Sequence, residues 1–337
     1  MISLLKKIIN YLLILFIMVL AFNCAEGKQE ENNNEKGSEA EASFSGSDIQ
    51  TPFVIDAQSR SRNETPEDYQ IRVAGKNNVK NRTAVNFLYD LKGKLNNDGA
   101  VSEEVEFDKK GRKIKHVLYM GTNKINFIWL FKYDNNDNLV EFNSYDENNI
   151  LLQKKVLSYN KVNKITESNE IYPTRNNQIN YKYIYNESGL LIETKGNNSK
   201  GISTSEKRSY NSSDRIESIL SLSHDGTVVS NNKLEYDNRG NIIKEIYKDS
   251  NNNEMITTYE GYNSPYPEQV NMPIQKKVYK YDSKGNVLLE MMYNSDGGRQ
   301  YKYKNEYDEK GLITKRTRYD ALDKPALIIK YEYSFYN

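Results

Sequence analysis

A short string of residues recurs along most of this chain at an almost constant interval. The string is an aromatic residue, then Asp or Asn, two variable residues, and Gly, Asp or Asn. Eight copies begin at Phe107, Tyr133, Tyr159, Tyr185, Tyr210, Tyr236, Tyr281 and Tyr307, with successive spacings of 26, 26, 26, 25, 26, 45 and 26 residues. A fixed period over so many copies is typical of a repeat architecture, in which each unit packs on its neighbours.

The chemistry of each copy predicts a β-hairpin. Asp or Asn suits the first position of a type I turn, and Gly suits the fourth, where a positive φ forms the bulge of a three-residue loop. If the aromatic residue is position 0, it faces position +6 on one side of the sheet. Position +6 is apolar in seven copies, at Leu139, Ile165, Leu191, Ile216, Ile242, Val287 and Ile313, and is Lys113 in the first.

A second turn closes each repeat, as in Tyr145-Asp146 and Tyr319-Asp320, so each repeat contributes two strands. The long interval is one further period, ending at Tyr262, plus a Pro-rich insert. Eight copies predict about 16 strands, and open sheets of more than ~10 strands curl. We therefore expect an all-β fold: a long antiparallel meander of hairpins that twists into an open superhelix or rolls towards a barrel, with residues 330–337 as a final edge strand.

The blocks Tyr279-Lys-Tyr-Asp-Ser-Lys-Gly-Asn-Val287 and Leu234-Glu-Tyr-Asp-Asn-Arg-Gly-Asn-Ile242 resemble YD repeats of the Rhs type. The resemblance covers about residues 101–337, although the period here is longer than is usual in that family. It implies spiralling β-sheets and a bacterial envelope context. It carries over no toxin and no catalytic residue.

Residues 1–23 have the features of a signal peptide. Lys6 and Lys7 are followed by an apolar run that is short for a membrane span and ends at Cys24, the only cysteine. This arrangement resembles a bacterial lipoprotein signal, in which the cysteine receives lipid, including palmitate, and becomes the first residue. Ala21 fits that pattern and Asn23 departs from it. An uncleaved anchor, or a secretory signal with an incidental cysteine, is the alternative.

The sequence divides into four parts. After the signal peptide, residues 24–50 hold Cys24 and a polar stretch typical of a disordered tether. Residues 51–100 are expected to be a transitional segment with a degenerate first repeat at Tyr89-Asp90, and residues 101–337 the repeat domain. We expect lipid anchoring in the cell envelope, most simply at the outer membrane, with the surface and periplasmic faces both open.

Composition excludes several functions. The balance of 47 basic and 46 acidic residues argues against nucleic-acid binding. One cysteine and two histidines leave no disulfide framework and no Cys/His zinc site. His116 and His224 are interpreted as structural. Asp249, Asn251, Asn253 and Glu260 resemble a calcium loop in spacing, but Glu254 replaces its glycine and a repeat-closing turn is favoured. We predict no catalytic, cofactor or metal site, and Cys24 as the single modified residue.

Tyrosine, present 27 times, has two interpretations. The tyrosines at position 0 are expected to form a buried stripe. The alternative is a contact surface for protein or glycan partners, for which Tyr262 and Tyr266 in the insert, expected to point outward, are better candidates than the position-0 residues. The sequence thus favours a non-catalytic binding scaffold, anchored to the membrane by lipid, with an unidentified protein or glycan ligand. A periplasm-facing structural or assembly component is the alternative, and a polysaccharide-active enzyme is less favoured.

Overall fold

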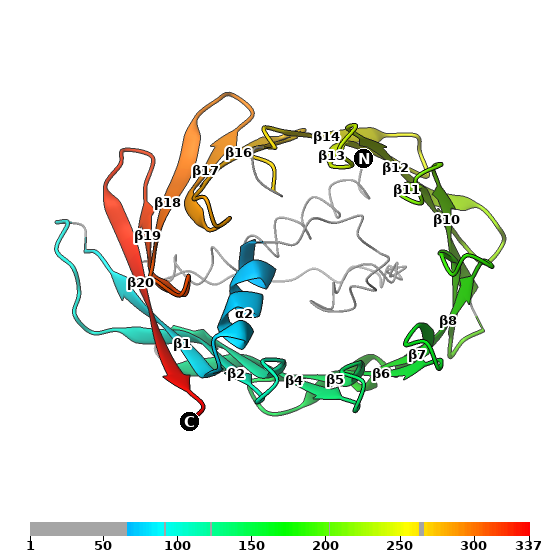
Figure 1. Ribbon diagram of the computed structural model, residues 1–337, viewed down its shortest axis with the longest axis horizontal. Coiled ribbons are helices and arrows are strands. Elements are labelled where there is room, and N and C mark those ends of the chain that lie inside the picture. The colour runs from blue at the N-terminus through cyan, green and yellow to red at the C-terminus, as the bar shows by residue number, and fades with distance from the viewer. Residues whose placement is uncertain (1–65, 91, 122, 202, 263–265) are drawn as a thin grey trace, which may run out of the picture. The chain divides into compact units, whose positions relative to one another are not determined.

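The computed structural model describes residues 66–90, 92–121, 123–201, 203–262 and 266–337. All of them belong to one unit, Ile55–Asn337. They form one α-helix, a short 3-10 turn and twenty strands, shown in Figure 1. The helix is α2 (Pro66–Lys76), and the 3-10 turn is η1 (Pro173–Arg175). No helix among these residues is long and apolar enough to cross a membrane.

The strands follow one another along the chain with short connections. They are β1 (Val79–Leu88), β2 (Ala100–Phe107), β3 (Lys113–Met120), β4 (Lys124–Tyr133), β5 (Leu139–Asp146), β6 (Leu151–Tyr159), β7 (Ile165–Tyr172), β8 (Asn177–Tyr185), β9 (Leu191–Asn198), β10 (Ser203–Tyr210), β11 (Ile216–Leu222), β12 (Val228–Tyr236), β13 (Ile242–Asp249), β14 (Glu254–Glu260), β15 (Gln269–Met272), β16 (Gln275–Tyr281), β17 (Val287–Asn294), β18 (Arg299–Tyr307), β19 (Ile313–Tyr319) and β20 (Pro325–Phe335).

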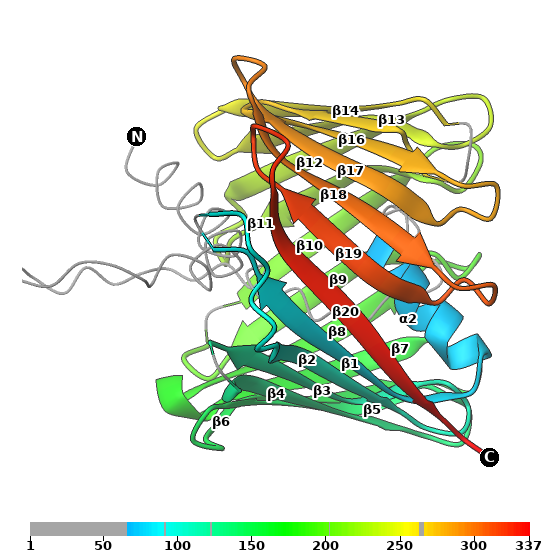
Figure 2. The same cartoon turned by 90° about the vertical axis from the view of Figure 1, so that its left-hand side faces the viewer.

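Every strand pairs antiparallel with the next, and β20 pairs with β1 over nine residue positions. The meander therefore closes into a barrel, and Figure 2 shows β20 beside β1. The predicted all-β meander is confirmed. The prediction that residues 330–337 form the edge strand of an open sheet is wrong, because β20 pairs with β1 as well as with β19 and so closes the sheet. Residues 327–330 are paired on both sides, and residues 331–335 are paired with β1.

The hairpin geometry follows the repeat. In the turn after β12, the Asp237 amide bonds to Asn241 O and the Gly240 amide bonds to Asp237 O. Gly240 has a φ of 90°, which non-glycine residues rarely adopt. The Tyr236 position pairs with Ile242 across a register shift, and the other seven copies pair in the same way. The apolar residues at +6 are all buried, with exposed fractions of 4–8%.

The residues before the first full copy also contribute to the unit. Residues 66–88 supply α2 and β1, the strand that closes the barrel. Tyr89-Asp90 begins a turn of the same hydrogen-bond pattern, with the Asp90 amide bonded to Lys94 O. Strand β1 runs opposite to β2, so this turn lies at the opposite end of the barrel from the turn after Phe107.

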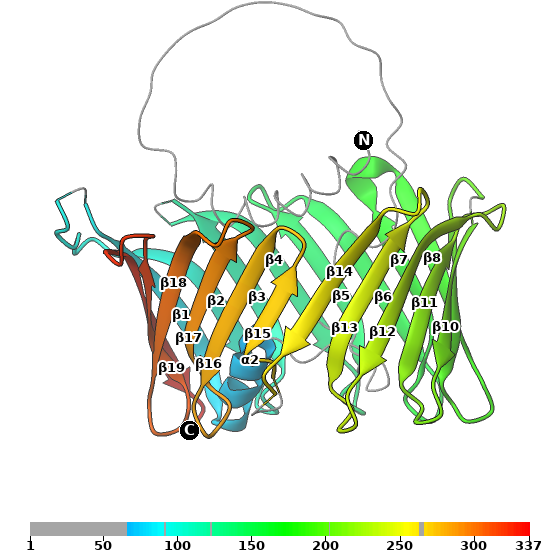
Figure 3. The same ribbon diagram turned by 90° about the horizontal axis from the view of Figure 1, so that it is seen from above.

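The helix α2 lies within the ring of strands, as Figures 1 and 3 show. Its Tyr69 ring is 6.1 Å from the Tyr266 ring, which stacks at 5.7 Å on Tyr281 of β16. The strand face that carries the position-0 residues therefore points inward. We call this the inner face, and the alternate strand positions make up the outer face.

Candidate functional site

The residues singled out by the sequence lie in different parts of the chain. Cys24 lies outside the described residues. His224 is exposed in a turn. Asp249 closes a turn: its carboxylate accepts hydrogen bonds from the Asn251 and Asn253 amides and from the Asn253 side chain. The repeat-closing interpretation of that segment is therefore confirmed. Among the described residues, no group of His, Cys, Asp and Glu is arranged to hold a metal ion.

His116 belongs to a buried ionic cluster on the inner face. Its Nε2 atom lies 2.7 Å from Glu103 Oε1, and its ring meets the Trp129 ring edge-on at 4.9 Å. The Arg82 guanidinium, 1% exposed, bonds to both Glu103 oxygens at 3.0 and 2.9 Å. Burial by itself raises the pKa of Glu103, but the charge of Arg82 and the hydrogen bond with His116 outweigh it and hold the pKa near 2. Glu103 therefore serves as a fixed anion that neutralises Arg82.

Other inner-face acids are held in the same manner. Glu170 pairs with Lys155 at 2.7 Å and accepts a hydrogen bond from Tyr172. Glu290 pairs with Arg316 at 2.7 Å, and that guanidinium lies 3.9 Å from the centre of the Tyr303 ring. These carboxylates are occupied by basic partners within the fold.

The position-0 tyrosines have a structural task. In six of these seven tyrosines the hydroxyl donates a hydrogen bond to the main-chain carbonyl of the +6 residue one hairpin earlier. Tyr262 and Tyr333, which follow Tyr236 and Tyr307 by one 26-residue period, make the same bond. Tyr281 instead bonds to Pro267 O, because the insert displaces the preceding hairpin. Burial raises the pKa of Tyr133 to about 12, so that its hydroxyl stays protonated and donates. The inner face thus combines the packing of the aliphatic +6 side chains with a series of hydrogen bonds from tyrosine hydroxyls to main-chain carbonyls, which we call the ladder.

The expectation that Tyr262 and Tyr266 point outward is wrong. They are only 6% and 8% exposed. Tyr262 joins the ladder through Ile242 O, since it ends a full 26-residue period, and Tyr266 fills the space between Tyr69 and Tyr281. Tyr266 of the insert therefore packs between α2 and the barrel wall instead of forming a contact surface for a partner.

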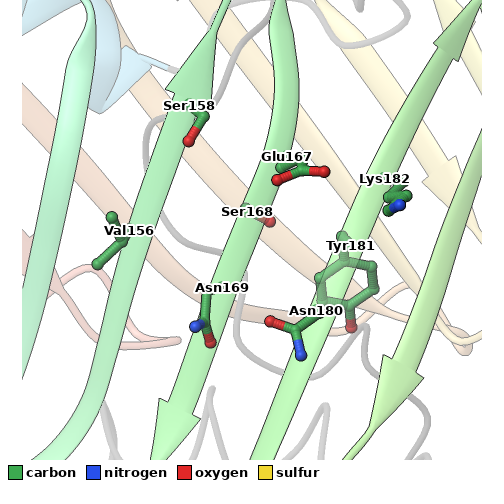
Figure 4. A pocket seen from close by; sticks show the side chains of 8 residues that line it. All are labelled: Val156, Ser158, Glu167, Ser168, Asn169, Asn180, Tyr181 and Lys182. Carbon is green, nitrogen blue, oxygen red and sulfur yellow. The ribbon is translucent and has the colours of Figure 1, made fainter.

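A shallow groove crosses β6, β7 and β8 and has a volume of about 310 Å³. It is lined by Val156, Ser158, Glu167, Ser168, Asn169, Asn180, Tyr181 and Lys182. Figure 4 views these strands with the opposite wall of the barrel behind them, so the near side is the outer face. Ser168 alternates with its outward neighbours, and its hydroxyl lies 3.1 Å from that of Tyr183 on the inner face.

Strand register arranges the outer-face side chains in two rows. Ser158 pairs with Glu167, which pairs with Lys182; Val156 pairs with Asn169, which pairs with Asn180. The groove therefore has an acid and a base, two amides, a hydroxyl and one small apolar side chain, with no net charge. These side chains can donate and accept hydrogen bonds.

Two features separate this groove from the wall beside it. On β5 the outer-face Glu141 is bonded to Lys132 at 2.7 Å and to Lys154 at 3.2 Å, whereas Glu167 and Lys182 face each other without such an ion pair. The Asn169 Oδ1 atom is shielded from solvent and has no hydrogen-bond donor among the described residues. The exposed Glu167 and Lys182 side chains are thus the polar groups of the groove that the fold leaves available.

Sequence reasoning missed this groove. Its residues occupy ordinary outer-face positions, and the turn that joins β7 to β8 does not follow the repeat. That turn contains η1 and the left-handed Asn176, so the register that places Asn169 beside Asn180 was not deducible from the period.

No protein-family model matches this chain, and no curated protein matches it. Solved structures that partly resemble this chain include a porin-like protein from Bacteroides uniformis, with 11% identity and a TM-score of 0.34 over 76% of this chain and 98% of that chain. A DUF1329 family protein from Desulfovibrio piger has 10% identity and a TM-score of 0.22 over 79% of this chain and 90% of that one. The match to a Tc holotoxin pore from Photorhabdus luminescens has 14% identity and a TM-score of 0.26. It covers 69% of this chain but 13% of that chain. These likenesses are too distant to assign a function.

Proposed function

We propose that this protein is an envelope lipoprotein, anchored through Cys24, whose β-repeat barrel serves as a non-catalytic binding scaffold. The observation that carries the proposal is a difference between the two faces of the barrel wall: the polar groups of the inner face are bonded within the fold, and the outer face carries the polar groove. The inner-face acids Glu103, Glu170 and Glu290 are paired with basic groups, and the position-0 tyrosines are bonded to the main chain.

The outer face supports a binding role. It is broad and mainly polar, and the groove across β6, β7 and β8 adds a concave region to it. The closed main-chain ladder fixes the spacing of outer-face side chains, because neighbouring strands lie ~4.8 Å apart. Such a wall presents side chains in set positions with little loss of conformational entropy on binding.

The anchor is tested by replacing its lipid site. The change Cys24→Ala in the full chain is expected to abolish labelling by a fatty-acid probe and to release the protein from the membrane fraction. Retention of label or of membrane association by Cys24→Ala contradicts the lipoprotein assignment.

The scaffold role is tested by affinity capture with the mature protein, starting at Cys24. We expect recovery of a specific envelope or host component that survives high-salt washing. A mature protein that captures nothing specific, together with a deletion strain whose envelope integrity is impaired, would favour a structural component of the envelope over a binding scaffold.

A further inference from the structure

The first question for the groove is what kind of ligand its place in the fold allows. An extended peptide can add a strand only at an exposed sheet edge. Every described strand here has a neighbour on both sides, and β20 is joined to β1 over nine positions. Closure therefore rules out strand addition in this region, so a ligand must be recognised by side chains.

The second question is the chemistry of those side chains. Protein interfaces depend on buried Trp, Tyr and Arg anchors. The outer-face lining has none: Tyr181 belongs to the inward-facing set, and the apolar contribution is Val156, 37% exposed. A polar groove without such an anchor is a poor site for a protein partner.

The third question is which ligand would use the groups that are present. Glu167 and the amide oxygens accept hydrogen bonds, while Lys182 and the amide nitrogens donate them. A sugar hydroxyl both donates and accepts hydrogen bonds, so it can pair with either kind of group in the groove. Glu167 and Lys182 cancel in charge, so the groove gives no advantage to an anionic ligand.

We infer that the groove across β6, β7 and β8 binds a neutral glycan chain through its hydroxyl groups. This inference rests on the proposed scaffold function and names the ligand class for one part of the scaffold. The chain lies across the strands, so that consecutive hydroxyl groups meet Val156–Asn169–Asn180 and the parallel row Ser158–Glu167–Lys182.

The test uses the mature lipoprotein in detergent and isothermal titration calorimetry. The neutral probes are maltohexaose, cellohexaose and a linear mannan fragment, and hyaluronan is the anionic comparison. We expect one neutral probe to bind more tightly than hyaluronan. The double change Asn169→Ala and Asn180→Ala is expected to weaken that binding about tenfold, since two hydrogen bonds are lost.

A matched control is available in the next strand. Asn197 of β9 pairs with Asn180 and continues the same row, but it does not line the groove. Asn197→Ala is expected to bind as the unmodified protein does. Glu167→Gln is a second groove variant at an exposed position, which keeps the test valid if the double change disturbs folding.

Three results would overturn the inference: none of the neutral probes binds, hyaluronan binds more tightly, or the groove variants bind as well as Asn197→Ala. These results are separate from a failure of the scaffold function. If the mature protein still captures a specific partner after the groove changes, the scaffold function is supported and the glycan site in the groove is contradicted.

Discussion

The hydroxyl group of Tyr236 donates a 2.7 Å hydrogen bond to the main-chain carbonyl of Ile216, twenty residues earlier. The two residues belong to successive hairpins. The contact lies where a register shift between Glu235 and Tyr236 interrupts the main-chain pairing of β12 with β13. The phenol thereby supplies a donor beside a local irregularity of main-chain pairing. Ile216, Leu234 and Ile242 pack together beneath it.

Removal of this hydroxyl tests the ladder directly. Tyr236→Phe keeps the ring and its packing, and is expected to lower the free energy of unfolding by about 1 kcal/mol, the net value of one such hydrogen bond. The measurement is denaturant unfolding of the full chain. Tyr145→Phe is the control, because the Tyr145 hydroxyl has no such main-chain bond among the described residues. An equal loss in both variants would argue against the ladder.

The Glu103 cluster predicts a dependence of stability on pH. The pKa of Glu103 is about 2 in the folded protein against an ordinary value of 4.5. Its contribution is therefore complete above pH 4.5 and is lost as the pH falls towards 2. Glu103→Gln is expected to lower the unfolding free energy at pH 7 by about 3 kcal/mol, because Arg82 loses the carboxylate that binds it. The variant should also show a shallower loss of stability in acid.

Glu141 on the outer face is a comparison that distinguishes the effect of burial on stability from the effect of charge pairing alone. Glu141 also has a pKa held near 2, chiefly by its hydrogen bond from Lys132, but that lysine side chain is 66% exposed. Solvent screening reduces the value of such a pair to about 0–1 kcal/mol. If Glu141→Gln destabilises the protein as much as Glu103→Gln, the importance assigned to the buried cluster is wrong.

The docking of α2 depends on two glycines. A Cβ atom placed on Gly75 would lie 2.3 Å from Gly111 O, so Gly75→Ala is expected to push the helix away from the turn after β2. Amide hydrogen exchange of residues 66–76 should then quicken by at least tenfold, while the strands of the barrel stay protected. Lys76→Ala, at the exposed end of the helix, is the control. Unchanged exchange in Gly75→Ala would contradict this packing.

Closure of the barrel predicts a specific cross-link. Thr83 of β1 pairs with Glu332 of β20. In a Cys24→Ala background, the pair Thr83→Cys and Glu332→Cys is expected to oxidise to a disulfide that raises the unfolding free energy by about 2–4 kcal/mol. Non-reducing electrophoresis and mass spectrometry detect it. Thr83→Cys with Glu254→Cys should stay reduced, because Glu254 lies on β14, which pairs with β13 and β15 and not with β1. Similar oxidation of both pairs would contradict closure.

Local geometry was readable from the sequence. The pairing of Tyr236 with Ile242, and the burial of Leu139 and Leu191, followed from turn chemistry, because Asp and Gly at fixed positions set the hairpin register whatever lies further away. The candidate groove was not readable. It depends on the register between β7 and β8, and that register is set by the non-repeating turn at Pro173–Arg175.

Consecutive antiparallel hairpins with one apolar column follow from the amino-acid sequence alone, since a constant period repeats the same local forces. The tertiary structure alone decided that this column faces inward, that β20 meets β1, and that α2 packs within the ring. Those outcomes depend on residues about 250 positions apart, such as Thr83 and Glu332. Their meeting is set by the accumulated twist and curvature of all twenty strands, which no single repeat encodes.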